Sequence, residues 1–109
     1  MGRVVIVAFA PKPDKTARLA ALVAQHAQIL REERLITDRA AYFMRAANGT
    51  IVEVFEWRSA KAIEQAHGHP RVQALWGEFA ACCDYVPLAS LAESRQLFAE
   101  FESLHSVDM

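Results

Sequence analysis

YFMRAANGTIVEVFEW, residues 42–57, is the stretch that decides the fold of this 109-residue chain. Two runs rich in β-branched and aromatic residues flank Asn48-Gly49, and both of these residues tolerate the positive φ that a tight turn requires. The stretch therefore predicts a β-hairpin with a two-residue turn. Such a turn pairs Met44 with Glu53 and places Glu53 and Tyr42 on the same face of the sheet.

The segments on either side of the hairpin supply the remaining elements. Before it, residues 3–9 are β-branched and apolar and predict a strand, and apolar residues spaced by three and four predict an amphipathic helix over residues 15–34. After it, the pattern predicts a helix over residues 60–83 that is interrupted at Gly68-His69-Pro70, a fourth strand over residues 85–91 and a short terminal helix over residues 94–101.

The resulting order, strand-helix-strand-strand-helix-strand, is that of the ferredoxin-like βαββαβ sandwich. We therefore expect one α+β domain over residues 1–109, with a four-stranded antiparallel sheet and helices on one face. A sheet with one solvated face carries polar residues at alternate positions. The first strand instead places Val4 and Ile6 on one side and Val5 and Val7 on the other. Both faces are thus apolar, which predicts a homodimer that forms a dimeric α/β barrel.

Composition limits the partners and the location. Twelve basic residues are balanced by 13 acidic ones, for a formal net charge of −1, so no nucleic-acid partner is expected. The apolar run from Val4 to Ala10 is too short for a membrane span or a signal peptide. We expect no membrane association and a cytoplasmic location. Cys82 and Cys83 are neighbours on a predicted helix, and we expect both thiols to stay reduced.

A strand that ends in Glu56-Trp57 and runs directly into a helix carrying His67 resembles the dimeric α/β barrel superfamily. The likeness is to its antibiotic biosynthesis monooxygenase-like branch in particular. It extends over residues 4–91 and also rests on Ser59, Ala62 and Pro70-Arg71-Val72. The resemblance implies a pocket between sheet and helices, and a cofactor-independent monooxygenase or isomerase that acts on a small aromatic compound.

The site residues of two related branches can be compared with this chain. Haem-degrading members use an asparagine on the first strand, which is absent here, and a tryptophan and a histidine where alignment on Trp57 puts Ala66 and Trp76. No haem or other cofactor is therefore expected. The YCII-like branch is a second resemblance. It carries a histidine in the first helix, matched by His26, and an Asp-Pro pair where this chain has His69-Pro70.

Three histidines are the candidate catalytic residues. His26 belongs to the apolar stripe of the first helix, and His67 and His69 lie on either side of Gly68 at the helix interruption. A histidine is a suitable general base because its ordinary pKa lies near neutrality. The alternative is that each histidine only forms a structural hydrogen bond to a backbone group. No metal is expected, because His67 and His69 lack a third ligand at a suitable spacing.

Four further residues are candidates for ligand binding: Tyr42, Glu53, Trp57 and Trp76. A carboxylate among apolar neighbours can act as a base or can pair with an arginine. The aromatic rings can line a flat pocket or simply fill the core. Three functions therefore stay open: an oxygenase or isomerase, a non-catalytic binder of a small apolar ligand, and a structural dimer without a pocket.

Overall fold

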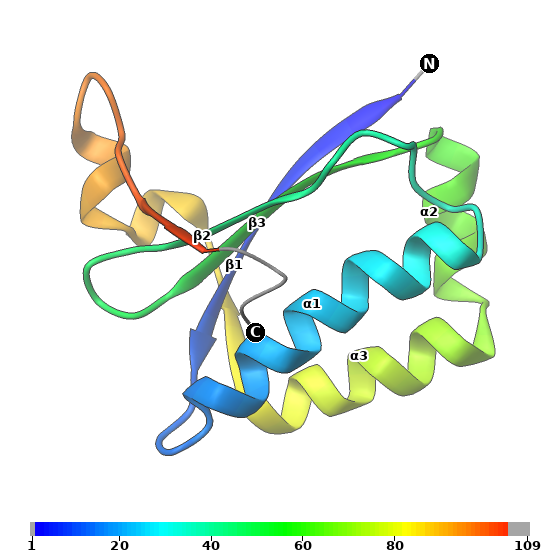
Figure 1. The fold of residues 1–109 in the computed structure, drawn as a ribbon, viewed down its shortest axis with the longest axis horizontal. Helices are drawn as coiled ribbons and strands as arrows, with labels where there is room; N and C mark the ends of the chain where they lie inside the picture. Colours follow the sequence, from blue (N-terminus) through cyan, green and yellow to red (C-terminus); the bar gives the residue numbers. More distant parts are fainter. Residues whose placement is uncertain (1, 105–109) are drawn as a thin grey trace.

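The computed structural model describes residues 2–104, and over these residues an antiparallel sheet of five strands lies against three α-helices (Figure 1). The order across the sheet is β4-β1-β3-β2-β5. In chain order the elements are β1 (Arg3–Pro11), α1 (Thr16–Glu32), β2 (Tyr42–Arg45), β3 (Ile51–Trp57), α2 (Ala60–His67), α3 (Pro70–Cys82), β4 (Cys83–Val86) and β5 (Glu102–Leu104). The expected α+β class and antiparallel sheet are confirmed.

The β2–β3 hairpin turns over three residues, not two. The backbone N–H of Ala46 donates to the carbonyl of Thr50 at 2.8 Å, so Ala47 joins Asn48 and Gly49 in the loop. Gly49 has a φ of +93°, a conformation that glycine adopts without strain. The Asn48 side chain stabilises the loop, because its Oδ1 accepts a hydrogen bond from the Thr50 N–H at 2.9 Å.

The extra loop residue shifts the hairpin register by one. Glu53 pairs with Phe43 rather than with Met44, and Tyr42 pairs with Val54. A shift of one residue exchanges the two faces of a strand. The expectation that Tyr42 shares a face with Glu53 is therefore wrong: Tyr42 lies on the outer face of the sheet and is 69% exposed.

The helices lie close to their predicted positions and bury the predicted faces. The buried positions of α1 follow the expected stripe: Leu19, Leu22, Val23, His26, Ala27 and Leu30. The Ser59 Oγ caps α2 by accepting from the Ala62 N–H at 3.1 Å. His69 caps α3, and Pro70 occupies its first turn.

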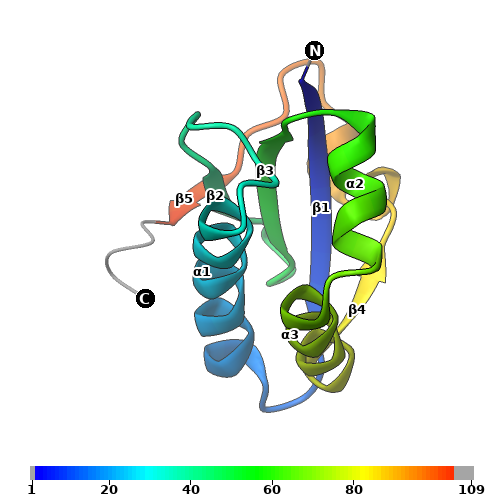
Figure 2. The same ribbon diagram turned by 90° about the vertical axis from the view of Figure 1, so that its right-hand side faces the viewer.

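All three helices lie on one side of the sheet, with α1 and α3 side by side and α2 over the N-terminal half of β1 (Figure 2). The core between the sheet and the helices contains several aromatic rings. Two of them, Phe9 and Phe79, stack with centroids 4.9 Å apart. None of the helices that the structure describes has the length and apolarity needed to cross a membrane.

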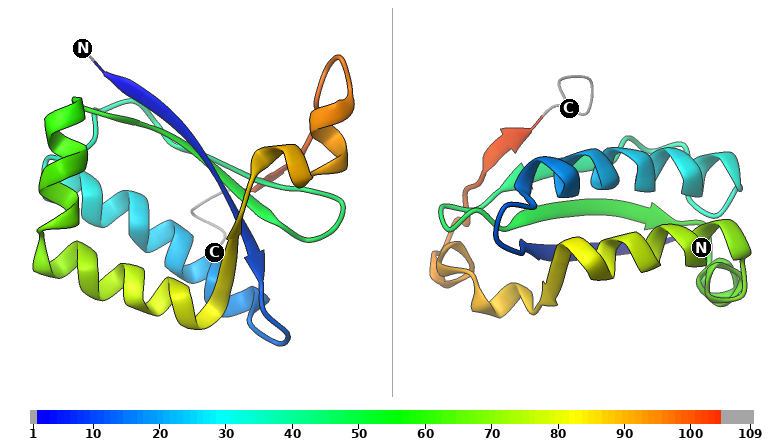
Figure 3. Two further views of the ribbon diagram at one scale, coloured as in Figure 1. Left: turned by 180° about the vertical axis from the view of Figure 1, so that it is seen from behind. Right: turned by 90° about the horizontal axis from the view of Figure 1, so that it is seen from below.

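The chain after β4 differs from the prediction. The fourth strand ends at Val86 instead of Leu91, and the helix expected over residues 94–101 is not formed. Two short 3-10 turns, at Leu88–Ser90 and Ala92–Arg95, pass on the side of the sheet opposite the helices (Figure 3). The chain then returns to pair β5 with β2, which corrects the strand count from four to five.

Candidate functional site

A pocket of about 350 Å³ lies between the sheet and the helices. Its size is at the lower end of the range for small-molecule sites. Its walls come from six elements, β1, α1, β3, α2, α3 and β4, and consist of Val5, Val7, Phe9, His26, Phe55, Trp57, His67, Trp76 and Tyr85. Among the described residues no lysine, arginine or carboxylate lines it. The pocket therefore suits a small, mainly apolar molecule.

A hydrogen-bonded chain of three side chains reaches from the core to this pocket. The Nδ1 atom of His26 lies 2.8 Å from Glu53 Oε1, and the indole Nε1 of Trp76 lies 3.2 Å from His26 Nε2. The three residues come from α1, β3 and α3. The fold thus joins three residues that the sequence identified separately.

The hydrogen-bond donors among these three side chains determine the tautomer of His26. An indole N–H can only donate, so His26 Nε2 accepts from Trp76. The hydrogen on the imidazole must then lie on Nδ1, which donates to Glu53 Oε1. A histidine whose Nδ1–H is held by a carboxylate, and whose Nε2 carries no hydrogen and acts as an acceptor, has the arrangement of an oriented general base.

Glu53 is held with little freedom. It is fully buried, and its Oε2 has no hydrogen-bond partner among residues 2–104. Edge-on contacts from Phe55 and Phe79 clamp the His26 ring, with centroids 5.5 and 5.3 Å away. A buried carboxylate that is only half satisfied is costly for a fold, which marks the pair as a candidate functional feature.

The pocket walls include residues that the sequence did not single out. Tyr85 reaches the site because β4 pairs it with Phe9 of β1. Burial of part of its ring raises the pKa of Tyr85, and the nearby Cys83 and Glu53 add to the rise. At neutral pH its phenol therefore stays protonated. The alternation of side chains along the predicted fourth strand could have identified Tyr85. The sequence did not show, however, which residue of β1 Tyr85 pairs with.

Of the other predicted histidines, His67 reaches the pocket and His69 does not. His67 lies at the end of α2, and its ring meets that of Trp76 edge-on with centroids 5.1 Å apart. His69 Nδ1 accepts from the Arg71 N–H, and its Nε2 donates to Glu33 Oε1 at 2.8 Å. This histidine has the capping role that was its alternative interpretation.

His69 belongs to a cluster of charges at the α1–α3 junction. Arg71 binds both Glu32 and Glu33, at 2.8 Å each. Its guanidinium lowers the pKa of both carboxyls, and His69 lowers that of Glu33 further. These groups pair with one another at the surface and lie outside the pocket.

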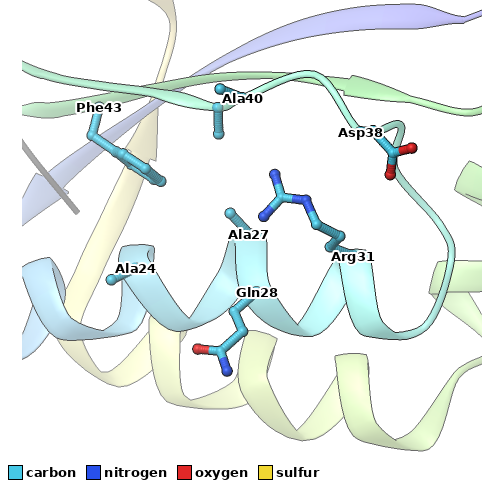
Figure 4. Close-up of a pocket in the computed structure, with 8 residues that line it drawn as sticks. Ala24, Ala27, Gln28, Arg31, Asp38, Ala40 and Phe43 are labelled. Carbon is cyan, nitrogen blue, oxygen red and sulfur yellow. The ribbon is translucent and has the colours of Figure 1, made fainter. Parts of the chain in front are cut away.

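A second cleft, of about 440 Å³, lies between α1 and the segment that leads into β2 (Figure 4). Small residues form much of it, with Arg31 and Asp38 at one end: Ala24, Ala27, Gln28, Arg31, Asp38, Ala40, Ala41 and Phe43. No histidine lines this cleft among the described residues, and it includes none of the predicted site residues. The pocket at His26 is therefore the candidate site.

Neither a metal centre within the described residues nor a known relative identifies a function for this pocket. Within residues 2–104, no group of three histidine, cysteine or acidic side chains is arranged to hold a metal ion. No family model, no curated protein and no solved structure matches this chain. The geometry of the pocket is therefore what indicates a function.

Proposed function

We propose that the protein binds a small aromatic molecule in the pocket and that His26, oriented by Glu53, acts on it as a general base. The observation that carries this proposal is the contact of 2.8 Å between His26 Nδ1 and the buried Glu53 Oε1 at the wall of an apolar pocket. A proton taken from the ligand moves to Nε2, and the adjacent carboxylate stabilises the charge on the imidazole ring.

The surrounding residues suit this chemistry. Phe55, Trp57 and Trp76 present flat aromatic surfaces to a planar ligand, and they exclude water from the base. The ligand anion that results can rearrange or react directly with oxygen. The activity is thus that of an isomerase or a cofactor-independent monooxygenase, as the resemblance to the antibiotic biosynthesis monooxygenase-like branch implies.

The same proposal includes a paired ferredoxin-like domain. The order β4-β1-β3-β2 within the sheet supports the ferredoxin-like assignment, with β5 as an addition. Val4, Ile6 and Tyr42 are 66%, 48% and 69% exposed on the outer face of the sheet, which supports a second copy as their cover. We also place the protein in the cytoplasm, where thiols such as those of Cys82 and Cys83 stay reduced.

The test is oxygen uptake and product formation with a panel of phenols, quinols and aromatic ketones. His26→Ala is expected to lower the rate by 10²-fold or more, as is typical for loss of a general base. His69→Ala is the matched control, because His69 lies outside the pocket, and its rate should stay close to that of the native chain.

Binding of the panel is measured in parallel by NMR. Equal rates for His26→Ala and the native chain would refute the general base. Ligand binding without turnover in the native chain would instead identify a binding protein, the second function that the pocket supports. A panel that neither binds nor reacts would leave the structural dimer.

A further inference from the structure

We infer that Trp76 is a specificity-determining residue: its indole N–H occupies the site on His26 that a ligand must take, so the pocket admits ligands that donate a hydrogen bond in its place. This inference rests on the proposed binding function of the pocket. It adds that the indole N–H of Trp76 and a hydroxyl group of the ligand compete for the same acceptor atom, His26 Nε2.

The geometry separates a fixed acceptor from a displaceable donor. His26 is 4% exposed and held by Glu53, and aromatic rings contact it edge-on from two sides. Trp76 is only partly buried, and its N–H makes one hydrogen bond of 3.2 Å within the described structure, to His26. A ligand that competes for Nε2 therefore displaces the indole and leaves the imidazole in place.

The Trp76 bond also decides which ligands can compete. It keeps the hydrogen of His26 on Nδ1, so Nε2 is an acceptor. A hydroxyl group on a ligand replaces the indole N–H without loss of a hydrogen bond. An ether or a ketone offers only acceptors, and binding it in that place leaves Nε2 without a partner, which costs the desolvation of that atom.

Charge excludes another class of ligand. Among the described residues no cationic side chain lines the pocket, and the Glu53 carboxylate lies behind His26. An anionic ligand would lose its hydration without a compensating charge. The preferred ligand is therefore an uncharged aromatic molecule with one hydroxyl group directed at Nε2.

The first measurement is the tautomer of His26, by NMR on the native chain labelled with ¹⁵N-histidine. Without ligand, His26 should show a protonated Nδ1 and an unprotonated Nε2. The opposite tautomer would overturn the inference, because Trp76 would then have no acceptor. This measurement is independent of any activity.

The second measurement compares p-cresol with its methyl ether, 4-methylanisole, as probes. We expect p-cresol to bind about two- to tenfold more tightly, the range that one net hydrogen bond provides. It should also shift the indole N–H resonance of Trp76 more than that of Trp57, the other tryptophan of the chain. Equal affinities for the two probes would overturn the exchange alone, whereas binding of neither would overturn the proposed function as well.

Trp76→Phe tests the competition directly. Loss of the indole N–H frees Nε2, so the affinity for p-cresol should rise about two- to tenfold while that for 4-methylanisole changes little. His69→Ala, outside the pocket, is the control and should leave both affinities as they are. A lower affinity of Trp76→Phe for p-cresol would refute the exchange. If this variant does not fold, the tautomer and the two probes on the native chain decide the question.

Discussion

Glu53 and His26 form the buried polar pair of the domain, and their contact has consequences for stability as well as for chemistry. Glu53 is fully buried, and its bond to His26 is the hydrogen bond that its carboxylate makes within residues 2–104. Removing one member of such a pair leaves the other buried without a partner. The pair should therefore behave as a unit in mutation.

A double-mutant cycle measures this dependence. His26→Leu should lower the free energy of unfolding by about 3–5 kcal/mol, because Glu53 is left alone in the core. The double variant His26→Leu/Glu53→Met replaces both groups with apolar ones and should recover most of that loss. Denaturant unfolding measures both values, with His67→Leu at the surface as a control that stays within about 0.5 kcal/mol. A double variant no more stable than His26→Leu would contradict the account.

Cys83 provides a prediction of pH dependence. Burial raises the pKa of its thiol to about 11, with smaller contributions from Cys82 and Asp84. The folded state thus holds this proton more tightly than the unfolded state, whose thiol has the ordinary value of 9.0. The associated stability is complete below pH 9 and is lost as the pH rises from 9 towards 11.

Alkylation by iodoacetamide, followed by mass spectrometry, reads out the same thiol. At pH 8 Cys83 should react far more slowly than an exposed cysteine introduced at Ala74, because thiolate is the reactive form. Comparable rates at the two positions would show that the thiol is neither buried nor shifted.

The sequence was sufficient to select single residues but not to predict their contacts. The helical stripe identified His26, and the odd carboxylate in a β-rich run identified Glu53. Their contact joins positions 27 residues apart and depends on how α1 crosses the sheet, which periodicity does not specify. Tyr42 was placed on the wrong face because turn chemistry gave the position of the loop but not its length.

At the scale of elements, the turn that terminates α1 contains a residue other than glycine in the left-handed backbone conformation. Arg34 has a φ of +59°, and around it the Leu35 N–H donates to the Leu30 carbonyl at 2.9 Å. This is the bond pattern of a helix that stops at a left-handed position, where glycine is preferred because a Cβ is strained there. The exposed Arg34 side chain makes no hydrogen bond or ion pair within residues 2–104.

Arg34→Gly should therefore stabilise the protein, by about 0.5–1 kcal/mol. For a domain of this size that corresponds to an increase in melting temperature of roughly 2–8 °C. Thermal unfolding followed by circular dichroism measures it. The same change inside the helix, Arg31→Gly, should have the opposite sign. A loss of stability in Arg34→Gly would show that its side chain contributes more than its backbone costs.

The hairpin loop offers the converse test. Apart from Gly49 and its two neighbours in the chain, no described atom lies within 4 Å of a Cβ added at this position, so there is room for a side chain. Gly49→Ala should nevertheless destabilise the domain by about 1 kcal/mol, because the φ of +93° is strained for alanine. An unchanged melting temperature would show that the loop adapts its backbone.

The terminal segment shows why a helix pattern alone was insufficient. Most helical stability in proteins comes from packing an apolar face, and short helices are marginal without it. Leu97 and Phe98 are 93% and 79% exposed, whereas Leu91 and Phe101 pack on the outer face of the sheet. These anchors and the β5 pairing hold the segment in an irregular path instead of a helix.

For the whole molecule, the outer sheet face is divided into two halves. Near the hairpin, Ala8, Ala46 and Val52 are buried under Leu91 and the terminal segment. At the other end of the strands, Val4 and Ile6 are exposed. An open apolar half on an otherwise covered face is the surface on which we expect a second copy to pack.

Ile6→Glu tests this pairing. Light scattering after gel filtration should give twice the chain mass of 12.2 kDa for the native protein and a single chain mass for the variant. The introduced charge would be desolvated in the interface, which is unfavourable. Lys61→Glu, on the exposed face of α2, is the control and should stay dimeric. A native protein that elutes as a clean monomer at micromolar concentration would refute the dimer.

The three-residue loop at 47–49 also has an evolutionary consequence. Deletion of Ala47 would leave Asn48-Gly49 as a two-residue turn between Ala46 and Thr50, which already pair across the loop. The register of β2 against β3 would then be kept, with Phe43 opposite Glu53 and Tyr42 on the outer face. Loss of a single codon here would thus leave the surroundings of Glu53 unchanged. In distant relatives this loop should therefore vary in length while the side chains that face Glu53 keep their alignment.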